Sequence, residues 1–80
     1  MQQILLAPQQ LGEILRSRRK ARRIPQQALA SKLGISQGRL SVLEGDPASL
    51  TLDRLLVLAK LLGLELIVRD KSAPSSKAEW

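Results

Sequence analysis

The sequence predicts a mainly α-helical domain of four helices, followed by one β-strand and a disordered tail. The apolar residues are almost all Leu, Ile, Val and Ala, with a single Trp as the only aromatic, and such cores favour packed helices. Apolar residues recur at helical spacing up to residue 62, whereas residues 64–70 lean toward alternation. Residues 71–80 have the Ser-, Lys- and Pro-containing composition of disordered segments.

Composition narrows the possible functions. Eighty residues form at most one domain, with a small core that often needs a disulfide, a metal or a partner. The chain has no cysteine and no histidine, which excludes disulfides, the usual zinc sites and Ser–His or Cys–His nucleophiles. We therefore expect a protein that is not an enzyme and has no cofactor, with self-association as the remaining stabiliser.

The positive charge is concentrated in one part of the chain. The net charge is +6, and six of the eight residues in 16–23 are Arg or Lys. Such a patch is typical of nucleic-acid binders, although a solubilising helix face would look the same. No signal peptide or membrane span is recognisable, so we expect a cytoplasmic, nucleoid-associated protein without membrane contact.

The first helix is predicted from residue 9 to about residue 23. Pro8 suits a first helical turn, and Leu11 and Leu15 belong to an inward stripe. Arg19 continues this stripe four residues after Leu15. We therefore expect its guanidinium at the edge of the core, with a carboxylate as partner.

Three further helices are predicted by turn and capping residues. The second spans 26–33 after Pro25 and ends at Gly34, which suits a left-handed turn. Ser36 can cap a third helix that runs to about Glu44. After a loop, Thr51 is the expected cap of a fourth helix that ends at Gly63.

The strand predicted at 64–70 needs a partner, because a lone strand leaves its backbone groups unpaired. It could pair with residues 2–7 of the same chain, with its own copy in a second subunit, or with another protein. We favour the second subunit, because dimerisation also stabilises a small core. The predicted dimer-strand residues are Leu64, Leu66, Ile67 and Val68.

The spacing within residues 30–43 favours a helix-turn-helix. A small residue at Ala30 lets two helices cross closely, and Gly34 makes the turn between them. Ile35, Leu40 and Leu43 then hold the second helix of the pair on the core. Any helical hairpin would want some of these residues, but five matches at fixed offsets beside a basic run favour DNA binding.

The outward side of this second helix would enter the major groove. Gln37 can pair with adenine, whereas Arg39 can read guanine or grip a phosphate, and Ser41 can bond to several groups. Gly38 would allow close approach or a backbone contact. Phosphate contacts without sequence information are expected from Gln26, Gln27, Lys32, Arg22 and Arg23.

The same residues resemble the Xre/Cro-type helix-turn-helix family. The matching run is P-Q-x-x-L-A-x-x-L-G-I-S-x-x-x-L-S-x-L-E-G, residues 25–45, preceded by spaced arginines. The resemblance covers roughly residues 9–63 and implies an internal ion pair between Arg19 and Glu44. It also implies base reading by Ser36, Gln37, Gly38 and Ser41.

Within that family, the chain is most similar to the HipB-type antitoxins. Those proteins add one strand that pairs across a homodimer, and some end in a flexible tail whose terminal Trp touches a HipA-type serine/threonine kinase toxin. Trp80 ends this chain and would be the toxin-binding candidate. The resemblance thus implies an antitoxin and autorepressor that binds inverted-repeat operators as a dimer.

Other functions remain open at the sequence level. A stand-alone phage-type or restriction-control regulator would share the helix-turn-helix, and Trp80 could be an accident of the gene's end. A pure protein-interaction domain would use the helices without DNA.

Three positions depart from the family pattern. Pro25 stands where Thr or Ser usually caps the second helix, and Arg23 stands where Gly is usual in the preceding turn. Gly38 replaces a larger residue, so the operator sequence is not inherited. The predicted segments are an arm at 1–8, the helix-turn-helix domain at 9–63, a dimerisation strand at 64–70 and a flexible tail at 71–80. The first seven residues could form a short strand or a loose arm.

Overall fold

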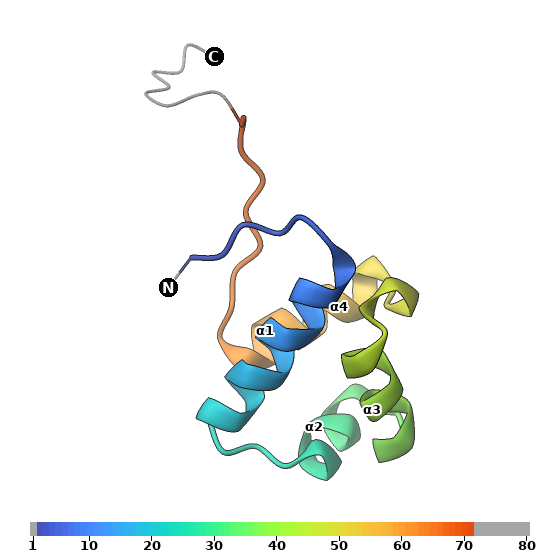
Figure 1. Ribbon diagram of the computed structural model, residues 1–80. Coiled ribbons are helices and arrows are strands. Elements are labelled where there is room, and N and C mark those ends of the chain that lie inside the picture. Colours follow the sequence, from blue (N-terminus) through green and yellow to red (C-terminus); the bar gives the residue numbers. More distant parts are fainter. Residues whose placement is uncertain (1, 72–80) are drawn as a thin grey trace.

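The computed structural model describes residues 2–71. In chain order it contains α1 (Pro8–Ala21), α2 (Gln26–Leu33), α3 (Gln37–Gly45), a 3₁₀ turn η1 (Pro47–Ser49) and α4 (Leu52–Leu62). In Figure 1, α1 lies in front of α4, while α2 and α3 form a pair to one side of them. The four predicted helices are therefore confirmed, with α1 ending two residues earlier than expected.

The predicted caps account for the starts of α3 and α4. The Ser36 hydroxyl accepts a hydrogen bond from the backbone N–H of Arg39 at 3.1 Å. The Thr51 hydroxyl accepts one from the N–H of Arg54 at 3.2 Å. Each bond satisfies a backbone donor that the first helical turn leaves without a partner. The Ser36 bond thereby fixes where the turn after α2 ends and α3 begins.

Three helices end in the same left-handed turn. The residue in the left-handed region is Arg23 after α1 (φ 55°), Gly34 after α2 (φ 75°) and Gly63 after α4 (φ 73°). In each case the next N–H returns to a carbonyl five residues earlier, for example from Ile24 to Arg19 at 3.0 Å. The turn after α1 therefore keeps the geometry that Gly would give, although Arg23 pays some conformational strain for it.

The core is small and aliphatic. Every helix contributes to one cluster, whose buried members are Leu15, Leu29, Ala30, Leu40, Leu58 and Leu62. Each fully buried Leu stabilises the fold by about 1.5–3 kcal/mol. Gly12 lets α1 approach the end of α3, because a Cβ there would collide with the Glu44 carbonyl oxygen and lie 2.8 Å from Pro47 Cγ.

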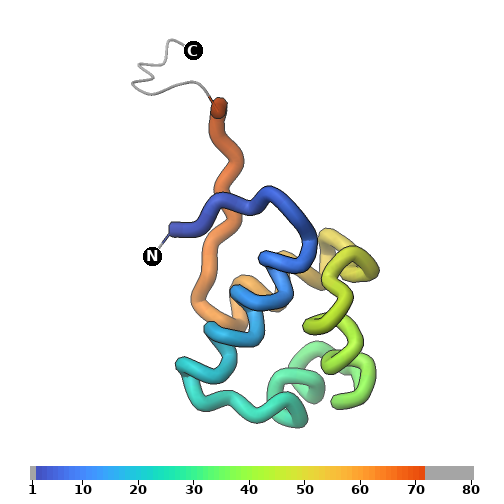
Figure 2. Tube along the Cα trace, in the orientation of Figure 1, coloured from blue at the N-terminus to red at the C-terminus, as the bar shows by residue number. Residues whose placement is uncertain are grey.

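The segment after α4 is not paired within the single chain. The N–H of Leu64 bonds to the Ala59 carbonyl at 2.8 Å, and no strand occurs anywhere in residues 2–71. The predicted strand at 64–70 is therefore not seen here, since its expected partner is another chain. Figure 2 shows residues 2–7 and 64–71 leaving the helices on the side away from α2.

Two remaining expectations from the sequence concern the C-terminal tail and membrane contact. Residues 72–80, with the toxin-binding candidate Trp80, lie outside the described residues. Among residues 2–71, no helix has the length and apolar character needed to cross a membrane.

Candidate nucleic-acid interface

Helix α3 turns its apolar side inward and its small polar side outward. Leu40 and Leu43 are each only 1% exposed, so they hold the helix on the core. The side chains expected to read bases all lie on the exposed surface: Ser36, Gln37, Gly38, Arg39 and Ser41. The fold therefore presents these residues together, on a helix whose orientation is fixed by its buried leucines.

A buried ion pair ties α1 to the end of α3. Arg19 Nε donates to Glu44 Oε2 at 2.7 Å, and Arg19 Nη2 donates to Glu44 Oε1 at 3.3 Å. A third donor, Arg19 Nη1, reaches the Ile24 carbonyl at 3.0 Å, which is in the turn before α2. Forked, charge-assisted bonds of this kind have both strength and a defined geometry. The pairing expected from the inward position of Arg19 is thus present.

Two glutamines carry this network to the surface. Gln26 Nε2 donates to Glu44 Oε1 at 2.9 Å, and Gln37 Nε2 donates to Gln26 Oε1 at 3.3 Å. The first residue of α3 is therefore connected through the first residue of α2 to the buried carboxylate. Within the described residues, no buried side-chain nitrogen or oxygen lacks a hydrogen-bond partner.

The surroundings of Glu44 favour its charged form. Burial alone raises the pKa of this carboxyl, because charge is costly away from water. Hydrogen bonds from Arg19 and Gln26, together with the positive charges of Arg19 and Arg16, outweigh burial and leave the pKa of Glu44 below its ordinary value. Arg16 Nε lies 3.7 Å from Glu44 Oε1.

The basic run does not act as a single patch. Arg18 Nε and Arg22 Nη1 both donate to the Leu62 carbonyl, at 2.9 and 3.1 Å. They thereby neutralise the partial negative charge at the C-terminal end of α4. Arg22, expected at a phosphate, is thus engaged at the end of α4, whereas Arg23 is exposed in the turn before α2.

The other expected phosphate contacts lie on α2. Gln27 and Lys32 are exposed and do not belong to the hydrophobic core. Gln26 is half-buried and holds the network described above. Arg18 and Arg22 lie four residues apart, but so do Arg19 and Arg23, so spacing within the basic run does not single out the pair that binds the end of α4.

Sequence reasoning missed one residue of the α3 surface. Val42 is 53% exposed, but its side chain has no polar group and so carries no sequence signal for base reading. Its place could have been inferred, because Leu40 and Leu43 cannot both face inward unless Val42 faces outward.

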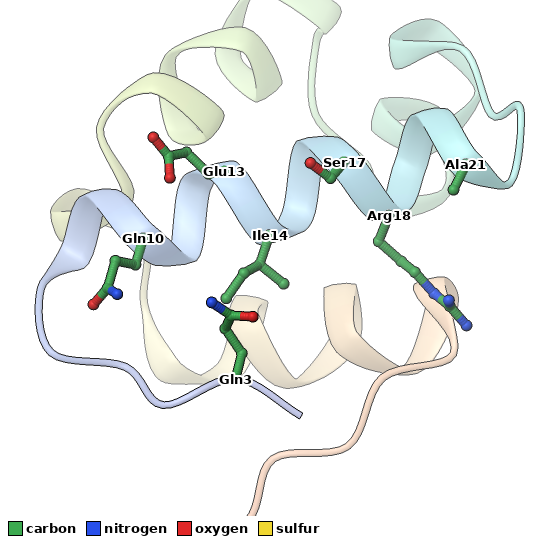
Figure 3. A pocket seen from close by; sticks show the side chains of 7 residues that line it. All are labelled: Gln3, Gln10, Glu13, Ile14, Ser17, Arg18 and Ala21. Atoms are coloured by element: carbon green, nitrogen blue, oxygen red, sulfur yellow. The ribbon is translucent and has the colours of Figure 1, made fainter. Parts of the chain in front are cut away.

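A groove on the opposite side of α1 is separate from this surface. It has a volume of about 440 Å³ and lies between α1 and the N-terminal arm, as Figure 3 shows. The groove is lined by Gln3, Gln10, Glu13, Ile14, Ser17, Arg18 and Ala21. The part of the chain described by the structure contains no cluster of acidic residues suited to a metal ion.

Comparison with known proteins agrees with this geometry. A family model described as helix-turn-helix matches residues 15–69. Because this match covers more than half of the chain, the protein belongs to that helix-turn-helix family.

Among solved structures the chain is similar to HipB. A HipA-HipB-O2-O3 complex contains a chain that is 28% identical, with a TM-score of 0.77, covering 89% of this chain and 100% of that one. The chain of a HipB-O1-O2 complex is 29% identical with a TM-score of 0.76, and the match covers 86% of this chain and 100% of that one. The chain of a HipB-O4 20mer complex is 28% identical with a TM-score of 0.77, and the match covers 89% of this chain and 100% of that one. No curated protein sequence matched the chain.

The state of Glu44 leads to a prediction about acid stability. Because its folded-state pKa is lowered, the carboxylate stabilises the fold above the pKa of the unfolded chain, and this stabilisation is lost as pH falls through the folded-state pKa. Glu44→Gln should cost about 3–5 kcal/mol at neutral pH, because Arg19 loses its counter-charge. Urea unfolding between pH 7 and about pH 3 should then show a weaker pH dependence than wild type.

The control is Glu13→Gln, which removes an exposed carboxylate from α1. This variant should still lose stability in acid as wild type does, because the Arg19–Glu44 pair is intact. If Glu44→Gln lost stability with acid as steeply as wild type, the ion pair would not be the source of the effect.

Proposed function

We propose that this protein is a homodimeric, sequence-specific DNA-binding antitoxin that represses its own operon, which encodes a HipA-type kinase toxin. The observation that carries the DNA-binding part is the exposed α3 surface, which is fixed through Gln26 to the buried Arg19–Glu44 pair. A polar helix face that is both exposed and immobilised is suited to reading a major groove.

The network determines which way the Gln37 amide points. Glu44 accepts from Gln26 Nε2, so Gln26 Oε1 is the atom left to face Gln37. Gln37 must then donate with one hydrogen of Nε2, and keeps its second hydrogen and Oε1 for a ligand. One donor beside one acceptor is the pattern that pairs with the N7 and N6 edge of adenine. Gln37 is therefore the principal base-reading residue of the proposal.

The neighbouring residues extend this contact. Ser36 Oγ already accepts from the Arg39 N–H, which leaves its hydroxyl hydrogen free to donate to a base or phosphate. Arg39 and Ser41 supply further donors on the exposed side of α3. Gln27, Lys32 and Arg23 would contact phosphates and contribute affinity that depends on salt rather than on sequence.

The dimer would form through the segment after α4. Leu66, Ile67 and Val68 are 41%, 68% and 99% exposed in the single chain, although residues of this kind are usually covered. Leu64 anchors the start of the segment by packing against the core. Antiparallel pairing of residues 64–70 with a second copy would cover these side chains and satisfy their backbone groups. Two α3 helices would then face successive major grooves, about 34–36 Å apart.

The toxin partner is supported by the similarity to HipB bound to HipA. A basic, DNA-bound dimer presents two identical outer surfaces, to which two copies of a partner can bind while the operator stays occupied. Trp80 remains the candidate contact for that partner.

Replacing Gln37 tests the base-reading assignment. Gln37→Ala should weaken specific binding by about 1–3 kcal/mol per half-site and leave thermal stability nearly unchanged, because the side chain is exposed. Gel-shift titration against a duplex selected from a random library, repeated at several salt concentrations, measures both affinity and salt dependence. The matched control is Gln9→Ala, an exposed glutamine on α1. Wild-type affinity for Gln37→Ala would refute the assignment, and a wild-type protein that selects no sequence would indicate a protein-interaction domain.

Breaking the strand tests the dimer. Val68→Pro removes a backbone donor from the middle of the segment and should prevent pairing. Sedimentation should report a dimer for wild type and a monomer for the variant, with unchanged helical content by circular dichroism. A variant that remained dimeric would place the interface elsewhere.

Co-purification from the native host tests the antitoxin assignment. We expect the tagged full chain to retain a protein with a kinase fold, and removal of Trp80 to reduce that retention while operator binding stays at the wild-type level. A chain that binds its operator but retains no kinase would be a stand-alone regulator.

A further inference from the structure

Val42 differs from every other exposed large hydrophobic residue in its location. The others lie on the N-terminal arm, on α4 or in the segment after α4: Ile4, Leu5, Leu6, Leu52, Leu56, Val57, Leu66, Ile67 and Val68. Val42 alone lies on α3, among polar side chains, and is 53% exposed. Among the exposed large hydrophobic residues of the described part of the chain, Val42 is therefore the one that lies on the helix proposed to read DNA.

The glycines beside Val42 also lack a role in the fold. Gly12 allows a close helix contact, and Gly34 and Gly63 adopt left-handed turns. A Cβ added at Gly38 or Gly45 would meet nothing within 4 Å, and neither residue has a positive φ. Gly38 is the second and Gly45 the last residue of α3, and neither the backbone conformation nor a close contact among the described residues requires Gly at these positions.

These three residues share one line of the helix. Gly38, Val42 and Gly45 are spaced by four and three residues, which places them on one face. Leu40, Leu43 and Glu44 are buried on the other side. Of the three residues on this outward face of α3, only Val42 has a side chain larger than a hydrogen atom. It projects between two glycines.

The major groove has one apolar group that matches such a side chain. Base edges in this groove present hydrogen-bond donors and acceptors, except for the C5 methyl group of thymine. The absence of side chains at Gly38 and Gly45 would allow a close approach that brings the Val42 methyl groups to the floor of the groove. A polar base edge at that position would instead lose water without gaining a hydrogen bond.

We infer that Val42 is a specificity-determining residue that selects a thymine in each half-site by contact with its C5 methyl group. This inference rests on the proposed DNA-binding function, which supplies the groove. It adds to the Gln37 assignment a preference that comes from apolar contact rather than from hydrogen bonding.

The test compares thymine with uracil, which lacks only that methyl group. A duplex selected by wild type from a random library is synthesised with uracil replacing each half-site thymine in turn, symmetrically in both half-sites. At one position, wild-type binding should weaken about fourfold per half-site, the equivalent of one buried methyl group at about 0.8 kcal/mol. With Val42→Ala, the same replacement should have no effect, as in a double-mutant cycle.

Val57→Ala is the matched control, because Val57 is 46% exposed on α4, away from α3. It should retain the wild-type response to uracil. Three results would overturn the inference while leaving specific DNA binding intact. They are a selected half-site that contains no thymine, wild-type binding that uracil weakens at no position, and a Val42→Ala variant that is as sensitive to uracil as wild type. Failure to select any sequence would overturn the proposed function together with it.

Discussion

The structure depends on the ion pair between Arg19 and Glu44. Its two groups are buried, so neither can be lost without leaving an uncompensated charge. The pair fixes the distance between α1 and the end of α3, and Gly12 permits that distance by carrying no side chain. The third bond of Arg19, to the Ile24 carbonyl, positions the start of α2 as well. The Arg19 side chain therefore links α1, the end of α3 and the start of α2 in a domain with only a small aliphatic core.

The same carboxylate is also the first member of the chain of contacts that reaches the proposed DNA surface. Because Glu44 can only accept hydrogen bonds while ionised, it determines the orientation of the Gln26 amide, and Gln26 in turn determines that of Gln37. Stability and the proposed base reading thus share one group. This arrangement orients the proposed reading residue before any DNA binds, so less conformational freedom would be lost on forming the proposed complex.

The sequence predicted most of the fold because its signals are local. Ser36, Thr51, Gly34 and Gly63 mark helix ends through bonds within a few residues, and the leucine spacing indicates which faces are buried. The inward position of Arg19 followed from the same spacing. Signals that depend on distant contacts were not readable: the run at 16–23 looked uniform, although Arg18 and Arg22 bind the end of α4. The strand predicted at 64–70 would need a second chain to pair with, so a single chain does not show it. Val42 has no polar group that would mark it as a base-contact candidate.

The α3 surface also has a consequence for how such a regulator diverges. Gly38, Arg39, Ser41 and Val42 are exposed, and among the described residues Gln37 is linked to the interior by a single hydrogen bond. Substitutions at these positions therefore leave the core intact. A duplicated copy of the gene could acquire a new operator through a few such changes, at little risk to folding. Two paralogues in one cell could in this way become insulated from each other's promoters while they keep the same scaffold.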